Sequence, residues 1–119
     1  MARENFVLKT LLETGIVSWK PKGNSMSGKI ESGSQVVVKK VPIKALRVGD
    51  AVYAKVKGSY YLHLLSAIDE SQDRYQISNN HGYVNGTISS NNIFGLCVEV
   101  AGNITVSDEE IQKRLIKYQ

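Results

Sequence analysis

The spacing of hydrophobic positions changes from helical to strand-like near residue 15. Phe6, Leu8 and Leu11 recur at near-helical intervals, which predicts a short amphipathic helix over residues 3–14, with Gly15 as its C-cap. From Ile16 onward the period is two, as in strands with one buried face. Segments rich in Val, Ile and Tyr predict strands at Ile16–Lys20, Gln35–Val41, Asp50–Val56, Tyr60–Ala67, Tyr75–Ser78 and Ile93–Val100.

Two segments complete the predicted architecture. The stretch from Asn79 to Asn92 is dense in Asn and Gly and predicts one or two tight turns. Residues 107–110 read Ser-Asp-Glu-Glu, a capping box that predicts a helix over residues 107–118. No repeat or linker divides the chain. We therefore expect one mostly-β domain over residues 1–119, with a β core at 16–100 and short helices at 1–15 and 107–118.

Composition narrows the class of protein. Hydrophobic residues make up 42% and charged residues 22% of the 119 positions, as in soluble globular proteins. No apolar run approaches the length of a transmembrane helix, and the first residues do not resemble a secretory signal. Cys97 is the only cysteine and has no partner for an internal disulfide. These features predict a cytoplasmic protein without a membrane anchor.

Charge is distributed unevenly along the chain. Residues 1–60 carry a net charge of +7 and residues 61–119 a net charge of −3. A basic half can bind nucleic acid, but these lysines and arginines alternate with apolar strand positions, which is typical of a solvated sheet face. A nucleic-acid partner is therefore not expected.

Three segments could carry chemistry. Ser25 lies in a loop between Gly23 and Gly28, where its hydroxyl could be exposed and neighbouring N–H groups could converge on an oxyanion; such loops are also common as plain turns. His63 shares a strand face with Tyr61 and Leu65, so it is either a core residue or a general base. The amides after Ser78, together with His81, could orient an imidazole or satisfy a turn. Positions 63, 81 and 97 match no standard metal-ligand spacing, and we expect no metal and no cofactor.

Taken in order, these segments resemble the serine peptidase domain shared by LexA-type and phage repressors, UmuD-like proteins and signal peptidases. Its Gly-x-Ser-Met-x-Pro box is similar to residues 23–28, Gly-Asn-Ser-Met-Ser-Gly, and its Gly-Asp-x-Val box matches residues 49–52. His63 falls where the family places its general base. Asn79 and Asn80, and then the strand beginning at Gly95, match the remaining segments. The resemblance covers roughly residues 16–100.

The resemblance implies a compact, largely antiparallel β-fold and assigns roles to residues. Ser25 would be the nucleophile and His63 the general base, with Asn24 and Met26 supporting the loop and its oxyanion hole. The sequence departs from the pattern because Gly28 replaces the proline, Ser34 an aspartate and Leu64 an arginine. Family members with a histidine base place an acidic residue in the last box. That residue is missing here, and Asn80, His81 or Asn85 would have to orient His63.

Two hypotheses follow from this resemblance. One is a stand-alone peptidase of bacterial or phage type that acts in trans on a peptide or protein substrate. Self-cleaving members of the family carry an Ala-Gly or Cys-Gly bond upstream of the serine, whereas this chain has only Thr14-Gly15, ten residues before Ser25. The other is a catalytically degenerate module of the same fold, whose groove would bind a peptide, a protein partner or a second copy of the chain as a homodimer. The first requires Ser25 Oγ within about 3.5 Å of a His63 ring nitrogen.

Overall fold

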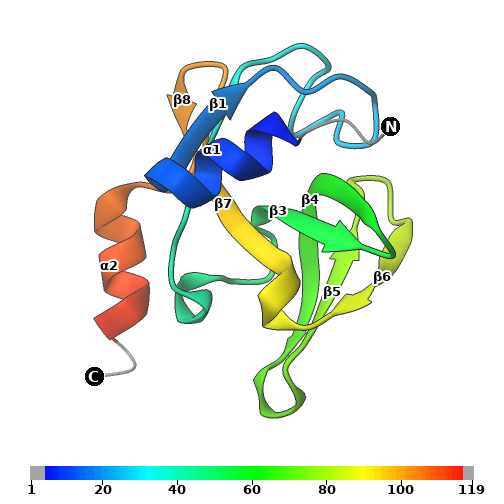
Figure 1. Cartoon of the computed structure of the whole chain (residues 1–119), viewed down its shortest axis with the longest axis vertical. Coiled ribbons are helices and arrows are strands. Elements are labelled where there is room, and N and C mark those ends of the chain that lie inside the picture. The colour runs from blue at the N-terminus through cyan, green and yellow to red at the C-terminus, as the bar shows by residue number, and fades with distance from the viewer. Residues whose placement is uncertain (1–4, 117–119) are drawn as a thin grey trace.

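The protein is built on one antiparallel sheet, seen here in a computed structural model that describes residues 5–116 (Figure 1). The strand order is β1-β2-β7-β3-β4-β5-β6, and β8 pairs with β7 outside this path. The predicted mostly-β class is confirmed. The strands are β1 (Ile16–Trp19), β2 (Val36–Lys39), β3 (Ala51–Val56), β4 (Ser59–Asp69), β5 (Arg74–Ser78), β6 (Val84–Ile88), β7 (Ile93–Val100) and β8 (Asn103–Ile104).

The predicted helices are present near both ends and are capped as the sequence indicates. Helix α1 spans Phe6–Thr14 and ends at Gly15, whose φ of +82° and N–H bond to the Leu11 carbonyl form a left-handed C-cap. Helix α2 spans Asp108–Ile116, and the Ser107 hydroxyl accepts from the Glu110 N–H at 3.0 Å. Positions 1–4, 117 and 118 of the two predicted helical segments lie outside the described residues. Within residues 5–116, no helix is long and apolar enough to span a membrane.

The prediction of only turns between Asn79 and Asn92 is wrong. This segment contains β6, which pairs with β5 through residues such as Ile77 and Gly86, and a 3-10 turn, η3 (Ser90–Asn92). Asn and Gly have low strand propensity, but the available ladder on β5 outweighs it. Two more 3-10 turns are η1 (Ile43–Ala45) and η2 (Glu70–Gln72). The short strand β8 was also not predicted.

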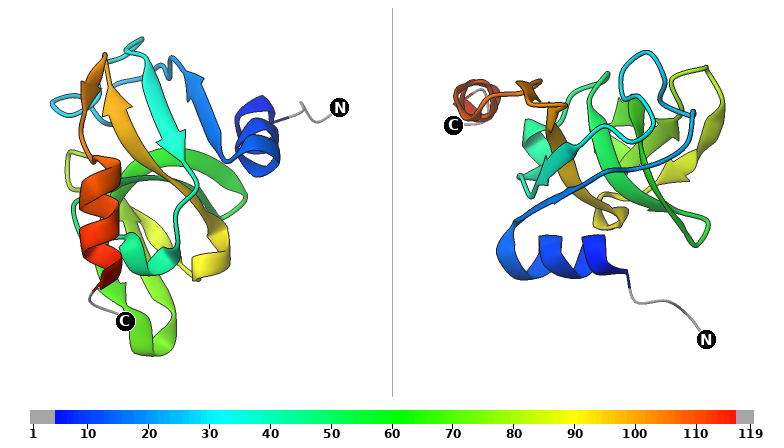
Figure 2. Two further views of the ribbon diagram at one scale, coloured as in Figure 1. Left: turned by 90° about the vertical axis from the view of Figure 1, so that its left-hand side faces the viewer. Right: turned by 90° about the horizontal axis from the view of Figure 1, so that it is seen from above.

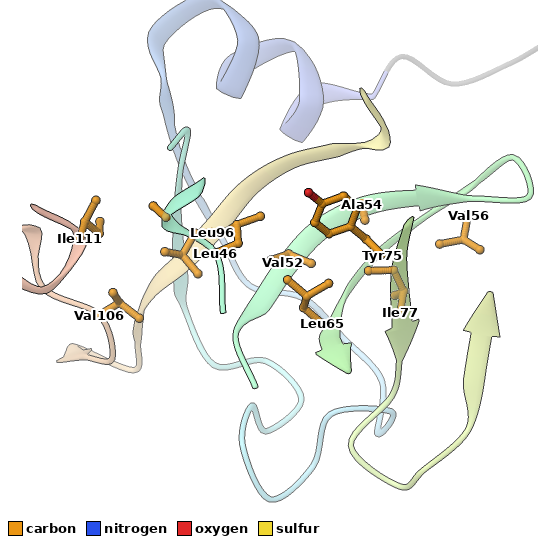
Figure 3. Close-up of a cluster of buried hydrophobic side chains, with 11 residues drawn as sticks. Leu46, Val52, Ala54, Val56, Leu65, Tyr75, Ile77, Leu96, Val106 and Ile111 are labelled. Carbon is orange, nitrogen blue, oxygen red and sulfur yellow. The ribbon is translucent and has the colours of Figure 1, made fainter. Parts of the chain in front are cut away.

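Each face of the sheet carries a buried core cluster, and each helix contributes to a different one. The two helices lie on different sides of the molecule (Figure 2). Adjacent residues on β3, Val52 and Tyr53, belong to different clusters because successive side chains point to opposite faces. The first cluster, drawn in Figure 3, extends from Ile77 on β5 to Ile111 on α2. The second joins Leu11 of α1 to β1, β2 and β7.

Close packing of α1 on the sheet depends on Gly95 of β7. A Cβ at this position would lie 2.6 Å from Val38 Cγ1 and 3.0 Å from Leu11 Cδ2. The next residue but one, Cys97, is buried in the same cluster as Leu11, and burial raises the pKa of its thiol to about 11. Cys97 is thus a neutral, small packing residue.

The first half of β4 forms an open edge of the sheet. Residues 59–64 pair with β3 on one side, whereas pairing with β5 on the other side begins only at Leu64. The loop between β1 and β2 lies against this edge and carries Ser25. This edge positions the site described next.

Candidate active site

The loop from Lys20 to Gln35, here called the serine loop, is held by its own turns and by two buried side chains. The Ile30 N–H bonds the Met26 carbonyl at 2.7 Å, and the Gly33 N–H bonds the Pro21 carbonyl at 2.8 Å. Met26 and Ile30 are each only 5% exposed. They anchor the loop in the core, while Ser25 beside Met26 remains exposed.

Gly28 gives the serine loop a backbone conformation that proline could not adopt. Its φ is +96°, whereas the proline ring fixes φ near −65°. A Cβ at Gly28 would lie 3.0 Å from Asn80 Nδ2, the group that donates to the Ser27 carbonyl at 2.9 Å. The departure from the family box at this position is therefore accompanied by a specific contact with the β5–β6 turn.

Ser25 and His63, far apart in the sequence, lie in hydrogen-bond contact. Ser25 Oγ is 3.0 Å from His63 Nε2, inside the limit required for a nucleophile and its base. His63 Nδ1 is 2.7 Å from Asn85 Oδ1. Strand β4 supplies the histidine, the serine loop the serine, and β6 the asparagine. The three side chains form a continuous chain of hydrogen bonds.

The Asn85 contact determines which nitrogen of neutral His63 carries the proton. An amide oxygen only accepts, so Nδ1 must donate to Asn85 Oδ1. Nε2 then presents its lone pair to the Ser25 hydroxyl. His63 is 6% exposed, and burial lowers its pKa, an effect opposed by the Asn85 hydrogen bond. The neutral form, able to accept a proton, is therefore favoured at neutral pH.

Tyr61 is a neighbour of the site that sequence analysis did not include among the site residues. Its ring lies 4.7 Å from the His63 ring, centroid to centroid, at an interplanar angle of 34°. The two residues are two positions apart on β4 and so share a face. The same-face pattern was the signal that could have identified this contact. Tyr61 limits the orientations open to the imidazole.

The other two candidates for orienting His63 contact the serine loop instead. His81 Nε2 lies 2.9 Å from the Asn24 carbonyl and 3.0 Å from Ser27 Oγ. The Asn80 N–H donates to the Ser25 carbonyl at 2.8 Å. Of the three residues considered, Asn85 alone bonds His63 among the described residues. Asn80 and His81 instead fix the two peptide groups that flank Ser25.

Backbone amides beside the serine remain available for a ligand. Within residues 5–116, neither the Ser25 nor the Met26 N–H donates to a protein acceptor. Asn24 contributes its carbonyl, which accepts from the Ser27 N–H at 3.1 Å. N–H groups without an acceptor next to a nucleophile are the elements of an oxyanion hole.

A cavity of about 350 Å³ opens beside the serine–histidine pair. Both Ser25 and His63 line it, as do Leu62 on the open edge of β4 and several aromatic side chains. No group of three His, Cys, Asp or Glu side chains in the described part of the chain could hold a metal ion. The chemistry that these groups can perform is proton transfer from Ser25 Oγ to His63 Nε2, with attack on a carbon bound in the cavity.

Comparison with known families gives one match. The family model described as Peptidase S24-like matches residues 9–103, a range that includes Ser25, His63 and Asn85. No curated protein matches the chain.

Proposed function

Because this chain belongs to the Peptidase S24-like family, we propose that it is a serine peptidase in which Ser25 is the nucleophile and His63 the general base. The observation that carries the proposal is the hydrogen-bonded chain from Ser25 through His63 to Asn85. It fixes the tautomer of the neutral imidazole, so that the lone pair on Nε2 is directed at the hydroxyl that must lose a proton.

The reaction would proceed by acyl transfer. Ser25 Oγ attacks the substrate carbonyl carbon while its proton passes to His63 Nε2. The same proton then goes to the leaving amine as the peptide C–N bond breaks, leaving an ester on Ser25. A water molecule, deprotonated by His63, hydrolyses the ester and restores the hydroxyl. Asn85 cannot supply the negative charge that a carboxylate would place beside the imidazolium, which limits the rate.

The free N–H groups of Ser25 and Met26 would stabilise the oxyanion of the tetrahedral intermediate. Their direction is set by the carbonyls on the same peptides, since the Asn24 carbonyl is held by His81 and the Ser25 carbonyl by the Asn80 N–H. Preorganised donors of this kind act without reorganisation during the reaction.

The substrate would bind as an extended strand along the open edge of β4. The Leu65 N–H bonds the Asp50 carbonyl on the β3 side. Because alternate residues of an antiparallel strand point their backbone groups to opposite sides, the N–H and C=O of Leu62 face away from β3. Leu62 lines the cavity beside Ser25, so these groups could pair with a peptide backbone there.

The experiment that tests the proposal is covalent labelling with a fluorophosphonate probe between pH 6 and 9. We expect the parent protein to be labelled, Ser25→Ala to be inert, and His63→Ala to react at least 100-fold more slowly. Ser27→Ala is the matched control, because Ser27 lies on the same loop at the same distance from another histidine. It should be labelled like the parent.

Failure of labelling in a folded protein would overturn the catalytic proposal. A labelled Ser25→Ala variant would do the same, because the reactive group would then be another residue. If the folded protein is not labelled but still binds peptides in the cavity, the result would favour a catalytically degenerate module that only binds a peptide or protein partner.

A further inference from the structure

The cavity beside Ser25 extends into a cluster of aromatic rings from three strands. Its walls are Trp19 on β1, Tyr53 on β3 and Tyr60 on β4, and Met26, Ile30 and Leu62 complete the apolar lining. We call this part of the cavity the aromatic pocket. No described side chain of the protein fills it.

We propose that the aromatic pocket is a subsite for a bulky apolar side chain, the size of leucine or phenylalanine, on the peptide whose bond Ser25 attacks. The inference rests on the proposed peptidase function for its substrate, and it specifies the class of peptide that this chain selects.

The pocket is preformed because its rings hold one another. Trp19 meets Tyr53 edge-on with centroids 5.5 Å apart, and Tyr53 stacks on Tyr60 at 5.8 Å. The Tyr53 hydroxyl is further fixed by the side chain of Asn5, which donates to it at 3.0 Å. A guest side chain therefore enters a space that needs no reorganisation, which favours binding.

The size of the pocket selects against small residues. The whole cavity, of which the aromatic pocket is one part, measures about 350 Å³, and an alanine methyl group would make few contacts with the three rings of the pocket. A leucine or phenylalanine side chain would replace water against the rings and gain those contacts. Each additional methylene in such a pocket changes affinity by roughly tenfold or more.

The charges around the pocket favour an apolar guest over a cationic one. Lys22 lines the cavity, and Lys55 Nζ lies 5.4 Å from the centroid of the Tyr60 ring, so two cations already lie near the site that a cationic guest would enter. Glu31 also lines the cavity, but its carboxylate accepts from the Gly28 N–H at 3.2 Å. An acidic guest would have to leave water for the apolar lining of Met26, Ile30 and Leu62, which disfavours its binding.

Binding can be tested without turnover, because Trp19 is the only tryptophan of the chain and reports on its own pocket. Ser25→Ala protein is titrated with capped pentapeptides of sequence Ala-Ala-X-Ala-Ala, with Ala, Leu, Phe, Lys or Glu at X, and Trp19 fluorescence is followed. We expect Leu and Phe peptides to bind at least tenfold more tightly than the Ala peptide, and Lys and Glu peptides no more tightly than it.

A second variant locates the effect in the pocket. Tyr60→Ala, in the Ser25→Ala background, should reduce the preference for Phe over Ala at least fivefold. Tyr83→Ala is the matched control, because Tyr83 is 66% exposed and outside the cavity lining; it should keep the preference. If Tyr60→Ala does not fold, the peptide series on the single variant still decides the question.

The outcomes separate this inference from the peptidase proposal. Equal affinities across the series, tighter binding of the Lys or Glu peptide, or no binding of any peptide would overturn the subsite, whatever the labelling of Ser25 shows. Selective binding of Leu and Phe peptides by a chain whose Ser25 does not react would support the subsite and overturn the peptidase.

Discussion

Two serine–histidine contacts of equal length lie on the serine loop, and only one has the surroundings of a catalytic pair. Ser25 Oγ lies 3.0 Å from His63 Nε2, and Ser27 Oγ lies 3.0 Å from His81 Nε2. The serines are two residues apart, so loop position does not distinguish the pairs. The difference lies in what else each imidazole contacts.

The second partner of each histidine sets the direction of the hydrogen bond to serine. His63 gives its Nδ1 proton to Asn85, which leaves Nε2 free to accept from Ser25. The Nε2 of His81 also faces the Asn24 carbonyl, which only accepts, so this nitrogen must carry a proton and act as a donor. Neutral His81 therefore cannot take a proton from Ser27 through Nε2.

Burial separates the two pairs further. His63 is 6% exposed, lies against the Tyr61 ring and lines a cavity, whereas His81 lies on an exposed turn. A serine–histidine distance alone does not identify a general base. A candidate base also needs a third group on its imidazole, an unprotonated Nε2 and a cavity beside the pair, and His63 has all three.

The largest expected effect is the difference between the two histidines when each is replaced with glutamine. Glutamine can donate a hydrogen bond but cannot act as a base at neutral pH. We expect His63→Gln to lower the second-order rate of fluorophosphonate labelling by about 100- to 10,000-fold, because general base catalysis is lost. His81→Gln keeps a donor near the Asn24 carbonyl and should change the rate by less than about threefold.

Labelling rates of the two variants at pH 7.5, with circular dichroism to verify folding, check this expectation. Equal losses in both variants would remove the distinction between the two pairs, since His81 would then contribute as much as His63.

The period of hydrophobic residues predicted most of the sheet because it records burial directly. Val52 and Tyr53 point to opposite buried faces, and β3, predicted at Asp50–Val56, begins one residue later and ends at Val56 as predicted. Gly15 located the C-terminal end of α1 and Ser107 the start of α2, because a cap depends on residues that are close in the sequence. β6 was missed because its ladder depends on β5, and no local property of an Asn- and Gly-rich segment encodes that pairing.

The sequence predicted which residues form the candidate site but not which of them hydrogen-bond to one another. The resemblance singled out Ser25 and His63, and three candidates remained for the group that orients the imidazole. Only the β5–β6 pairing determines that Asn85 meets His63 while His81 meets the serine loop. The aromatic pocket was not predicted, because Trp19, Tyr53 and Tyr60 come from three strands whose order in the sheet is not written in any local pattern.

A smaller effect is expected at Asn85, the residue that distinguishes His63 from His81. Asn85→Ala removes the acceptor for Nδ1, so the tautomer with Nε2 protonated becomes populated and labelling should slow by about tenfold or more. Asn85→Asp should act in the opposite direction, because a carboxylate stabilises the imidazolium and raises the pKa of His63.

The pH profile of labelling makes this prediction specific. Burial lowers the His63 pKa, so the parent profile should have its midpoint below the ordinary histidine value of about 6.5. The Asn85→Asp midpoint should lie at higher pH, with a plateau rate at least equal to that of the parent. A midpoint unchanged by both substitutions would show that Asn85 does not act on the imidazole.

The smallest expected effect is on stability, where the burial of His63 should appear as a dependence on pH. Because the His63 pKa is lower in the folded protein, the unfolded chain binds more protons between the folded pKa and the ordinary histidine value. The free energy of unfolding of the parent should therefore decrease as the pH falls from 7.5 to 5. The His63→Gln variant has no proton to gain at this position, so its free energy of unfolding should decrease less over the same range. The decrease that remains comes from the carboxylates that both proteins contain.

Urea unfolding midpoints of the two proteins at both pH values measure this difference. If both proteins lose the same stability, burial adds no free-energy cost to the protonation of His63. The contrast with His81 would then rest on hydrogen-bond direction alone.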